Sequence, residues 1–223
     1  MGYIELLLQD KHLDDNQRKY GERALLQVRN NARLIDNIRK LAKIRVMSDS
    51  DFVPMDVQKA VAEAIDTVTK ATTDRKVTIV SALAPNTHYV MANQFIDDLF
   101  LNIISNAVKF DISKRVRVDV TISDETTSQG DFWIVSVVDR GRGIPDDRKK
   151  VVFERFATGM TGIKGFGLGL SIVSAVVEKV GGRIWVEDRI KGDSSKGTVF
   201  RIALPKANPQ ADQRDAKPSP AAQ

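Results

Sequence analysis

The 223-residue sequence contains no cysteine and only two histidines, His12 and His88. Without cysteine there can be no disulfide framework, thiolate zinc site or cysteine nucleophile, and two histidines argue against a transition-metal site. No apolar run approaches the roughly 20 residues of a transmembrane helix, and the N-terminus lacks the pattern of a signal peptide. We therefore expect a soluble, cytoplasmic chain that makes no membrane contact of its own.

The charges are mixed along the whole chain. Lys and Arg number 34 against 29 Asp and Glu, which gives a formal net charge of +5. The densest basic cluster, Arg148 to Lys150, directly follows two aspartates, which is typical of a solvated surface and not of a basic stripe that binds nucleic acid. With 42% hydrophobic residues, the composition predicts one medium-sized globular domain with an appendage and no nucleic-acid partner.

The N-terminal part has the pattern of a helical hairpin. Residues 2–10 predict the end of a helix, and 11–15 predict a turn. Asp14 or Asp15 is placed to cap a long helix that reaches about Met47. This helix carries an apolar stripe at spacings of three and four, made of Leu25, Val28, Ala32, Ile35, Ile38 and Ala42. Because so small a hairpin buries little of its stripe alone, we expect a homodimer that forms a four-helix bundle. Packing against the following domain is the alternative.

After a short linker at 47–58, the hydrophobic pattern predicts further helices and strands. The predicted helices are 57–72, 93–110 and 170–180, and the predicted strands are 77–83, 88–92, 115–123, 132–138, 183–188 and 198–204. A polar hairpin loop is expected at 124–131. The connection KGDSSKGT at 191–198 nearly matches a phosphate-binding P-loop, but Thr198 stands where the lysine belongs and a strand follows, so we reject that motif. The tail after Lys206 is predicted to be disordered.

Glycine is concentrated between Asp139 and Leu170. This stretch contains Gly141, Gly143, Gly159, Gly162, Gly165, Gly167 and Gly169. Glycine loses more backbone freedom on folding than any other residue, so such a density suggests a backbone that approaches a ligand closely. The last glycines lead directly into a helical pattern, and a helix N-terminus offers unpaired N–H groups and a positive dipole end to a phosphate. The stretch therefore predicts nucleotide binding, and the alternative is a surface loop with a chance cluster of glycines.

A second polar pattern lies on the predicted helix 93–110. Asn102, Asn106 and Lys109 fall on one line along the margin of its apolar side. Asparagine is a poor helix former, so two of them one turn apart beside the core call for an explanation. Amide oxygens and an ammonium group on one line can coordinate a magnesium ion and contact phosphates. The alternative is an ordinary solvated helix surface.

Five motifs in this order resemble a known family. They are LNIISNAVKF, DRGRGI, VFERF, GFGLGL and GTVF, and together they resemble the ATP-binding domain of sensor histidine kinases, within the group that includes gyrase, mismatch-repair and heat-shock chaperone ATPases. The resemblance covers about Asp51 to Lys206. It implies an α/β fold, a two-layer α/β sandwich with a mixed sheet. A partial dimerisation and phosphotransfer hairpin at 1–50 would precede this catalytic domain at 51–206, and a disordered tail at 207–223 would follow it.

The resemblance also implies a role for each residue of the motifs. Asp139 would accept a hydrogen bond from the adenine amino group, and Asn106 would ligate Mg2+. Asn102 and Lys109 would hold the phosphates of ATP. Residues 156–164 resemble the mobile lid, with Lys164 as its only cation because Ala157 and Thr158 stand where relatives often carry an aromatic residue and an arginine. The complete ATP-binding set is Asn102, Asn106, Lys109, Phe110, Asp139, Gly141, Gly143, Ile144, Lys164, Gly165, Phe166, Gly167, Leu168, Gly169 and Thr198.

The phosphoacceptor histidine that the resemblance implies is missing from this chain. The family places it about ten residues before a segment that corresponds to GYIELL, and the chain starts at that segment. His12 lies beyond it and is followed by LDD, so we do not expect His12 to be the acceptor. Hydrolytic relatives carry a glutamate where Asn102 stands, and an amide cannot act as a general base on water.

The sequence therefore predicts the ATP-binding part of a histidine kinase, a transferase of two-component signal transduction. It would position Mg-ATP for an external histidine, with a response-regulator receiver domain as the final acceptor, and the chain alone would not autophosphorylate. A serine or threonine kinase of the same ATP-binding group is one alternative. A nucleotide-binding interaction module without chemistry of its own is another. Whether a longer parent is membrane-anchored stays open.

Overall fold

The computed structural model describes residues 2–154 and 168–209. The chain divides into two compact units, Met1–Ala42 and Lys43–Gln223. Within the described ranges, no helix combines the length and the apolar composition that a membrane crossing requires. The predicted lid and most of the predicted C-terminal tail lie outside these ranges.

The first unit is a short helical hairpin. It contains α1 (Tyr3–Leu7) and most of α2 (Asp15–Val46). Asp14 caps α2 through a reciprocal pair, since Asp14 Oδ1 accepts from Gln17 N at 2.8 Å and Gln17 Oε1 accepts from Asp14 N at 3.0 Å. The two helices are joined by an ion pair at 2.9 Å between Glu5 and Arg29. The predicted turn and helix start are therefore confirmed.

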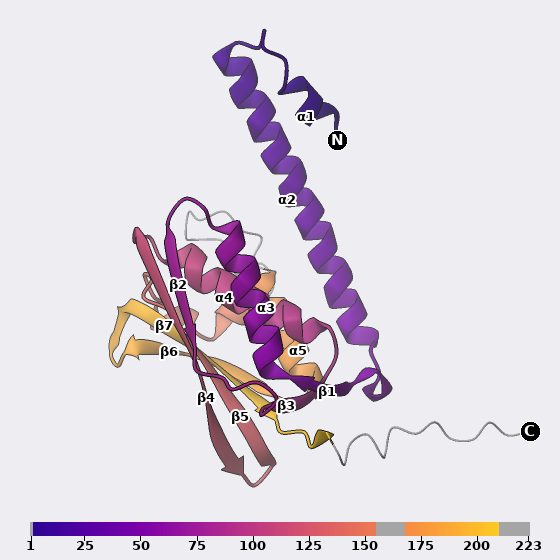
Figure 1. The fold of residues 1–223 in the computed structure, drawn as a ribbon, viewed down its shortest axis with the longest axis vertical. Coiled ribbons are helices and arrows are strands. Elements are labelled where there is room, and N and C mark those ends of the chain that lie inside the picture. Colours follow the sequence, from indigo (N-terminus) through magenta and orange to yellow (C-terminus); the bar gives the residue numbers. More distant parts are fainter. Residues whose placement is uncertain (1, 155–167, 210–223) are drawn as a thin grey trace, which may run out of the picture. The chain divides into compact units, whose positions relative to one another are not determined.

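The second unit is built on a five-stranded sheet with the order β2-β4-β5-β7-β6. Its strands are β2 (Lys76–Ser81), β4 (Arg115–Thr127), β5 (Gly130–Val138), β6 (Arg183–Ile190) and β7 (Asp193–Pro205). β2 pairs with β4 in parallel, and the other pairs are antiparallel. The helices α3 (Val57–Ala71), α4 (Phe95–Phe110) and α5 (Gly169–Lys179) lie together on one face of this sheet (Figure 1). The predicted two-layer α/β sandwich with a mixed sheet is confirmed.

The core lies between these two layers. The apolar side of α4 is fully covered, because Ile96, Leu99, Phe100, Ile103 and Ile104 are all 0% exposed. Val116, Val118 and Val120 alternate with exposed or half-buried residues along β4 and are also buried, as the period of two in a strand requires. Because α4 is held by its apolar side, its neighbouring polar margin is fixed in place at the edge of the core.

The predicted polar loop at 124–131 is wrong. β4 continues to Thr127 and β5 begins at Gly130, so only two residues make the turn. The ladder runs to the pair Thr127 with Gly130, and Thr126 Oγ1 is 2.6 Å from Asp131 Oδ1. These strand ends are largely solvent-exposed, so they carry polar residues although their backbone is paired.

The connection predicted at 191–198 is also mostly strand. β7 starts at Asp193, and Lys191 and Gly192 alone join it to β6. Gly192 has a φ of +81°, which suits so short a turn.

The linker predicted at 47–58 contains a strand that the sequence pattern did not predict. β1 (Val53–Asp56) pairs antiparallel with β3 (Tyr89–Ala92) in a separate two-stranded sheet. Pro54 lies in β1, which has a partner on one side only, and an edge strand tolerates proline because its other side needs no ladder hydrogen bond. Near the end of the described chain, Ala207 N donates to Tyr89 O at 2.9 Å.

Candidate nucleotide site

The polar margin of α4 faces the start of α5. Asn102 and Asn106 are half-buried and Lys109 is exposed. The Asn102 amide donates from Nδ2 to Asp98 O at 2.7 Å. A Cβ added to Gly169 would lie 2.7 Å from Asn102 Oδ1, so the first residue of α5 lies directly against this side chain. The structure thereby brings together two motifs that are far apart in the sequence.

The first turn of α5 has the features of an anion site. Leu168 occupies the N-cap position and has no side-chain acceptor for the helix N–H groups. The first turn carries no acidic residue. The buried Ser171 donates from Oγ to Leu168 O at 2.9 Å, so its hydroxyl group is already bonded within the helix. The backbone N–H groups and the positive dipole end of α5 are therefore suited to bind a phosphate.

Asp139 follows β5 directly and is only 3% exposed. Its Oδ1 accepts hydrogen bonds from Gly141 N at 2.9 Å and from Thr198 N at 3.1 Å. In return, Asp139 N donates to Thr198 O at 2.9 Å. The carboxylate is thus fixed between its own loop and the neighbouring strand β7.

Burial raises the pKa of Asp139 above its usual range, because a charged carboxylate is poorly solvated there. The N–H groups of Gly141 and Thr198 act in the opposite direction, and the nearby carboxyl of Asp111 raises the pKa further. A group with such a perturbed pKa at the end of a buried strand is a candidate for ligand binding.

Glycines allow three chain segments to meet around Asp139. A Cβ at Gly141 would lie 2.8 Å from Phe110 O at the end of α4. Gly143 has a φ of +69°, and its added Cβ would overlap the Ser194 carbonyl oxygen. Gly197 has a φ of +102°, and a Cβ added to it would overlap Asp139 O. The 139–143 loop can therefore fit between α4 and β7 only because these positions lack side chains.

Cationic groups surround the end of α4. The Arg142 Cζ and Lys109 Nζ atoms each lie 5.2 Å from the centroid of the Phe110 ring, which is within cation–π range. Arg75 donates to Val108 O at 2.9 Å and also to Asp111 O. A guanidinium that binds the last carbonyl groups of a helix stabilises its C-terminus.

Comparison with known families agrees with this geometry. A family model described as histidine kinase-, DNA gyrase B-, and HSP90-like ATPase matches residues 91–208. The chain belongs to this family. The match includes both glycine-rich motifs, the asparagine line of α4 and Asp139, so the resemblance predicted from the motifs is confirmed.

The relatives of this ATPase-family chain are sensor kinases. It is 38% identical over 126 residues to the signal transduction histidine-protein kinase/phosphatase MprB of Mycobacterium sp. (strain KMS), a match that covers 55% of this chain and 24% of MprB. It is 32% identical over 156 residues to the adaptive-response sensory kinase SasA of Prochlorococcus marinus subsp. pastoris, covering 68% of this chain and 40% of SasA. The chain therefore spans less than half the length of either relative.

Solved structures show the same fold. The mycobacterial sensor histidine kinase MprB superimposes with a TM-score of 0.59 and 27% identity, covering 70% of this chain and 97% of that one. Full-length ShkA in complex with AMPPNP gives a TM-score of 0.67 and 25% identity, covering 91% of this chain and 41% of ShkA. The chain has the histidine-kinase type of ATP-binding catalytic domain.

Most of the predicted site residues lie in two groups within this family fold. The first group is Phe110, Asp139, Gly141, Gly143, Ile144 and Thr198, around the end of β5. The second group is Asn102, Asn106, Lys109, Leu168 and Gly169, on α4 and at the start of α5. Lys164, Gly165, Phe166 and Gly167 lie outside the described residues. The ligand contacts of every residue in the set stay predictions.

Three neighbours of the site had no role in the sequence prediction. Arg142 stands between two glycines of DRGRG, so its place in that motif was an available signal. Ser194 and Arg75 carry no such signal. Ser194 approaches Gly143 through its own backbone carbonyl group, and the Arg75 side chain donates to the carbonyl groups of Val108 and Asp111, which lie more than 30 residues away.

Proposed function

We propose that this chain is the ATP-binding catalytic part of a sensor histidine kinase. It would position Mg-ATP for γ-phosphoryl transfer to a histidine outside this chain, and the phosphoryl group would pass on to an aspartate of a response-regulator receiver domain. The observation that supports this function best is Asp139, a nearly buried carboxylate that is held by backbone N–H groups at the edge of a glycine-lined loop.

At one end of the site, Asp139 would select the adenine base. Its Oδ1 already accepts two backbone hydrogen bonds, so we expect Oδ2 to accept from the adenine amino group. Gly141 and Gly143 let the backbone pass close to the base, and the half-buried Ile144 would contact its apolar face. Guanine carries a carbonyl oxygen in place of that amino group. This oxygen and the Asp139 carboxylate are both acceptors, so no hydrogen bond would form between them.

At the other end, α4 and α5 would hold the triphosphate. Asn106 offers an amide oxygen of the kind that Mg2+ accepts as a ligand. Among the residues that the structure describes, no three His, Cys, Asp or Glu side chains converge on one point, so the phosphates themselves would complete the metal coordination. Asn102, Lys109 and the first N–H groups of α5 would bind phosphate oxygens. Asn106 would hold the metal, and Mg2+ bound there would stabilise the charge that develops on the γ-phosphoryl group.

Asn102 favours transfer over hydrolysis. Its amide donates to Asp98 O, and an amide has no basic site that could remove a proton from water. The attacking group must then come from elsewhere, and His12 is a poor candidate because its exposed ring is paired with Asp10 at 2.9 Å in the hairpin turn. An imidazole on a separate phosphotransfer segment fits better.

The first unit has a surface that suits a second copy of the chain. Val28, Ile35 and Ile38 are each about half exposed, at spacings of seven and three along α2. A stripe with this period is the usual seam between packed helices. It supports the predicted homodimer, in which α2 of each copy would contribute to a four-helix bundle.

The experiment that tests this function combines nucleotide binding with phosphate transfer. Calorimetric titration should show binding of ATP with Mg2+ and much weaker binding of GTP. Incubation with γ-labelled ATP should leave the chain itself unlabelled. Equal affinity for GTP would contradict the selection of adenine by Asp139. A stable label on His12 would contradict the proposal that the phosphoacceptor histidine lies outside this chain.

The two alternatives give different results in the same assay. A serine or threonine kinase of the same group would place an acid-stable label on a protein acceptor, whereas phosphohistidine is acid-labile. An interaction module would bind ATP and transfer no label even to a phosphotransfer hairpin from one of the related kinases.

A further inference from the structure

The segment 139–149 begins at the proposed adenine end of the site and runs toward the predicted lid at 156–164. Its first residue is fixed to β7, because Asp139 exchanges backbone and side-chain hydrogen bonds with Thr198. Its middle also lies against β7, where a Cβ added to Gly143 would overlap the Ser194 carbonyl oxygen. The conformation of the remaining residues depends on whether the C-terminal end of the segment, at Lys149, is also held.

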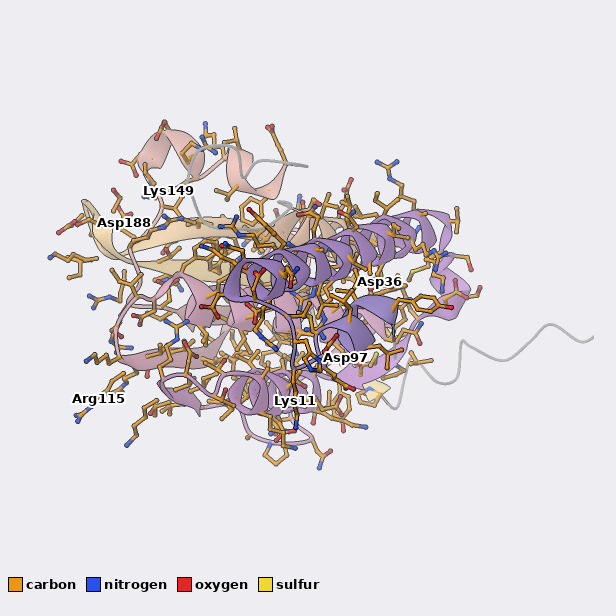
Figure 2. The ribbon with its side chains drawn as sticks, turned by 90° about the horizontal axis from the view of Figure 1, so that it is seen from above. Lys11, Asp36, Asp97, Arg115, Lys149 and Asp188 are labelled. Atoms are coloured by element: carbon orange, nitrogen blue, oxygen red, sulfur yellow. The ribbon has the colours of Figure 1, made fainter. Side chains whose placement is uncertain are left out.

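The far end is fixed by an ion pair to β6. Lys149 Nζ lies 2.6 Å from Asp188 Oδ1 and 2.5 Å from Asp146 Oδ1. The side chains of Lys149 and Asp188 are only 17% and 11% exposed, and Figure 2 shows them beside each other. Hydrogen bonds to Asp146 and Asp188 raise the pKa of Lys149, so the ammonium group stays charged at neutral pH. We call Lys149 and Asp188 the anchor pair.

Both ends of the segment are fixed to the same rung of the sheet. Asp188 of β6 stands opposite Thr198 of β7 in the antiparallel ladder, and Thr198 is the residue that binds Asp139. The segment therefore contacts the hairpin of β6 and β7 twice, at Asp139 near its start and at Lys149 at its end. A loop whose two ends are fixed has fewer conformations, and less entropy is lost when it orders around a ligand.

We propose that Lys149 is a positioning residue for the nucleotide, because its pairing with Asp188 holds the segment 139–149 in the conformation that receives the adenine base. This inference rests on the proposed function. Lys149 itself does not touch the base. Its effect is transmitted through the loop that contains Gly141, Gly143 and Ile144.

The inference is tested with K149M and D188N, with K150M as the matched control. Lys150 is exposed and adjacent in sequence, so its replacement changes the net charge equally without touching the anchor pair. We expect K149M and D188N to bind ATP about 3- to 10-fold more weakly than wild type, the range for a lost charge-assisted hydrogen bond that is partly exposed. K150M should bind like wild type.

Three further readouts separate positioning from general destabilisation. The loss should be the same for ADP and for ATP, because the anchor pair acts at the base end. K149R should restore most of the affinity, since it restores the charge. The double variant K149M/D188N should be no weaker than K149M alone, because K149M already removes the pairing with Asp188.

The possible failures are distinguishable. If wild-type protein binds no nucleotide, the proposed function fails, and the anchor-pair inference fails with it. If wild type binds ATP and both K149M and D188N bind it equally well, only the inference is overturned. A loss for ATP without a loss for ADP would also overturn it, because that pattern belongs to the phosphate end. If K149M does not fold, the ATP affinity of the isosteric variant D188N tests the inference in its place.

Discussion

The two ends of the proposed nucleotide site are built in different ways. At the base end, Asp139 is 3% exposed and its Oδ1 is bound by two N–H groups of the protein itself. At the phosphate end, Asn102 and Asn106 are half-buried, and α5 starts behind Leu168, which has no side-chain acceptor. The base end is therefore organised by contacts within the fold, whereas the phosphate end offers backbone donors that an anion can satisfy.

This contrast predicts two classes of variant. A change at the base end that removes these contacts should affect folding and nucleotide affinity together, because the same contacts serve both. A change at the phosphate end should affect the affinity and leave the free energy of unfolding nearly unchanged. The predictions below test this separation, beginning with the largest expected effect.

Gly143→Ala should produce the largest loss. The residue has a φ of +69°, and the new methyl group would overlap Ser194 O. We expect the free energy of unfolding to fall by about 2–4 kcal/mol, from the left-handed backbone and the overlap together. Urea denaturation followed by circular dichroism measures this change, and ATP titration of the folded fraction should show weaker binding as well.

Gly192→Ala is the matched control for this variant. Gly192 has a φ of +81°, and no atom of the residues that the structure describes lies within 4 Å of its added Cβ. It should lose only the backbone contribution, about 1 kcal/mol, with unchanged ATP affinity. Equal destabilisation of the two variants would mean that the contact with Ser194 has no energetic importance.

Asp139→Asn should weaken ATP binding by about 10- to 100-fold, because a charge-assisted hydrogen bond to the base is lost. The amide oxygen can still accept from Gly141 N and Thr198 N, so the fold should persist. Isothermal titration at neutral pH measures the affinity. An unchanged dissociation constant would remove Asp139 from the adenine end.

The same carboxyl group predicts a pH dependence. Since burial raises the pKa of Asp139, ATP affinity should fall as the pH falls through that raised value, while Asp139→Asn should lack this transition. For folding, the sign is opposite. The contribution of Asp139 to stability is complete below its ordinary pKa of 3.8 and is lost as the pH rises through the raised native pKa.

Asn106→Ala should have a smaller effect than Asp139→Asn and should separate the two ends most clearly. We expect about tenfold weaker ATP binding with Mg2+ and no change when the metal is chelated, because one metal ligand is lost. Alanine favours helix more than asparagine does, so the free energy of unfolding should stay the same or rise. A fall in stability, or an equal loss of affinity with and without Mg2+, would contradict the assignment.

The sequence named candidate residues for the site, but it did not predict most of the contacts that hold them. Asp139 and the glycines of DRGRG have a local signature, since they are adjacent in the chain and lie in a recognisable motif. The anchor pair has none, because Lys149 and Asp188 are ordinary charged residues on separate elements. Only the strand order and the register of β6 against β7 bring them together.

The lack of a local pattern for long-range contacts also explains which strands were predicted correctly. Val116, Val118 and Val120 alternate with more exposed residues and marked the buried part of β4. The outer parts of β4 and β7 carry polar residues at successive positions, so their sequence is typical of loops. Backbone pairing with the neighbouring strand keeps them extended, and that pairing depends on residues far away in the sequence.

The two tryptophans of the chain are both in the sheet. Trp133 of β5 lies edge-on to the His88 ring at 4.6 Å, with Lys206 Nζ 4.1 Å from its centroid. It stands six residues before Asp139, about 20 Å along an extended strand. Trp185 of β6 donates from Nε1 to Glu187 at 2.8 Å. Their fluorescence is therefore an intrinsic optical signal for the integrity of the sheet, and at Trp133 it originates far from the end of the strand where a nucleotide would bind.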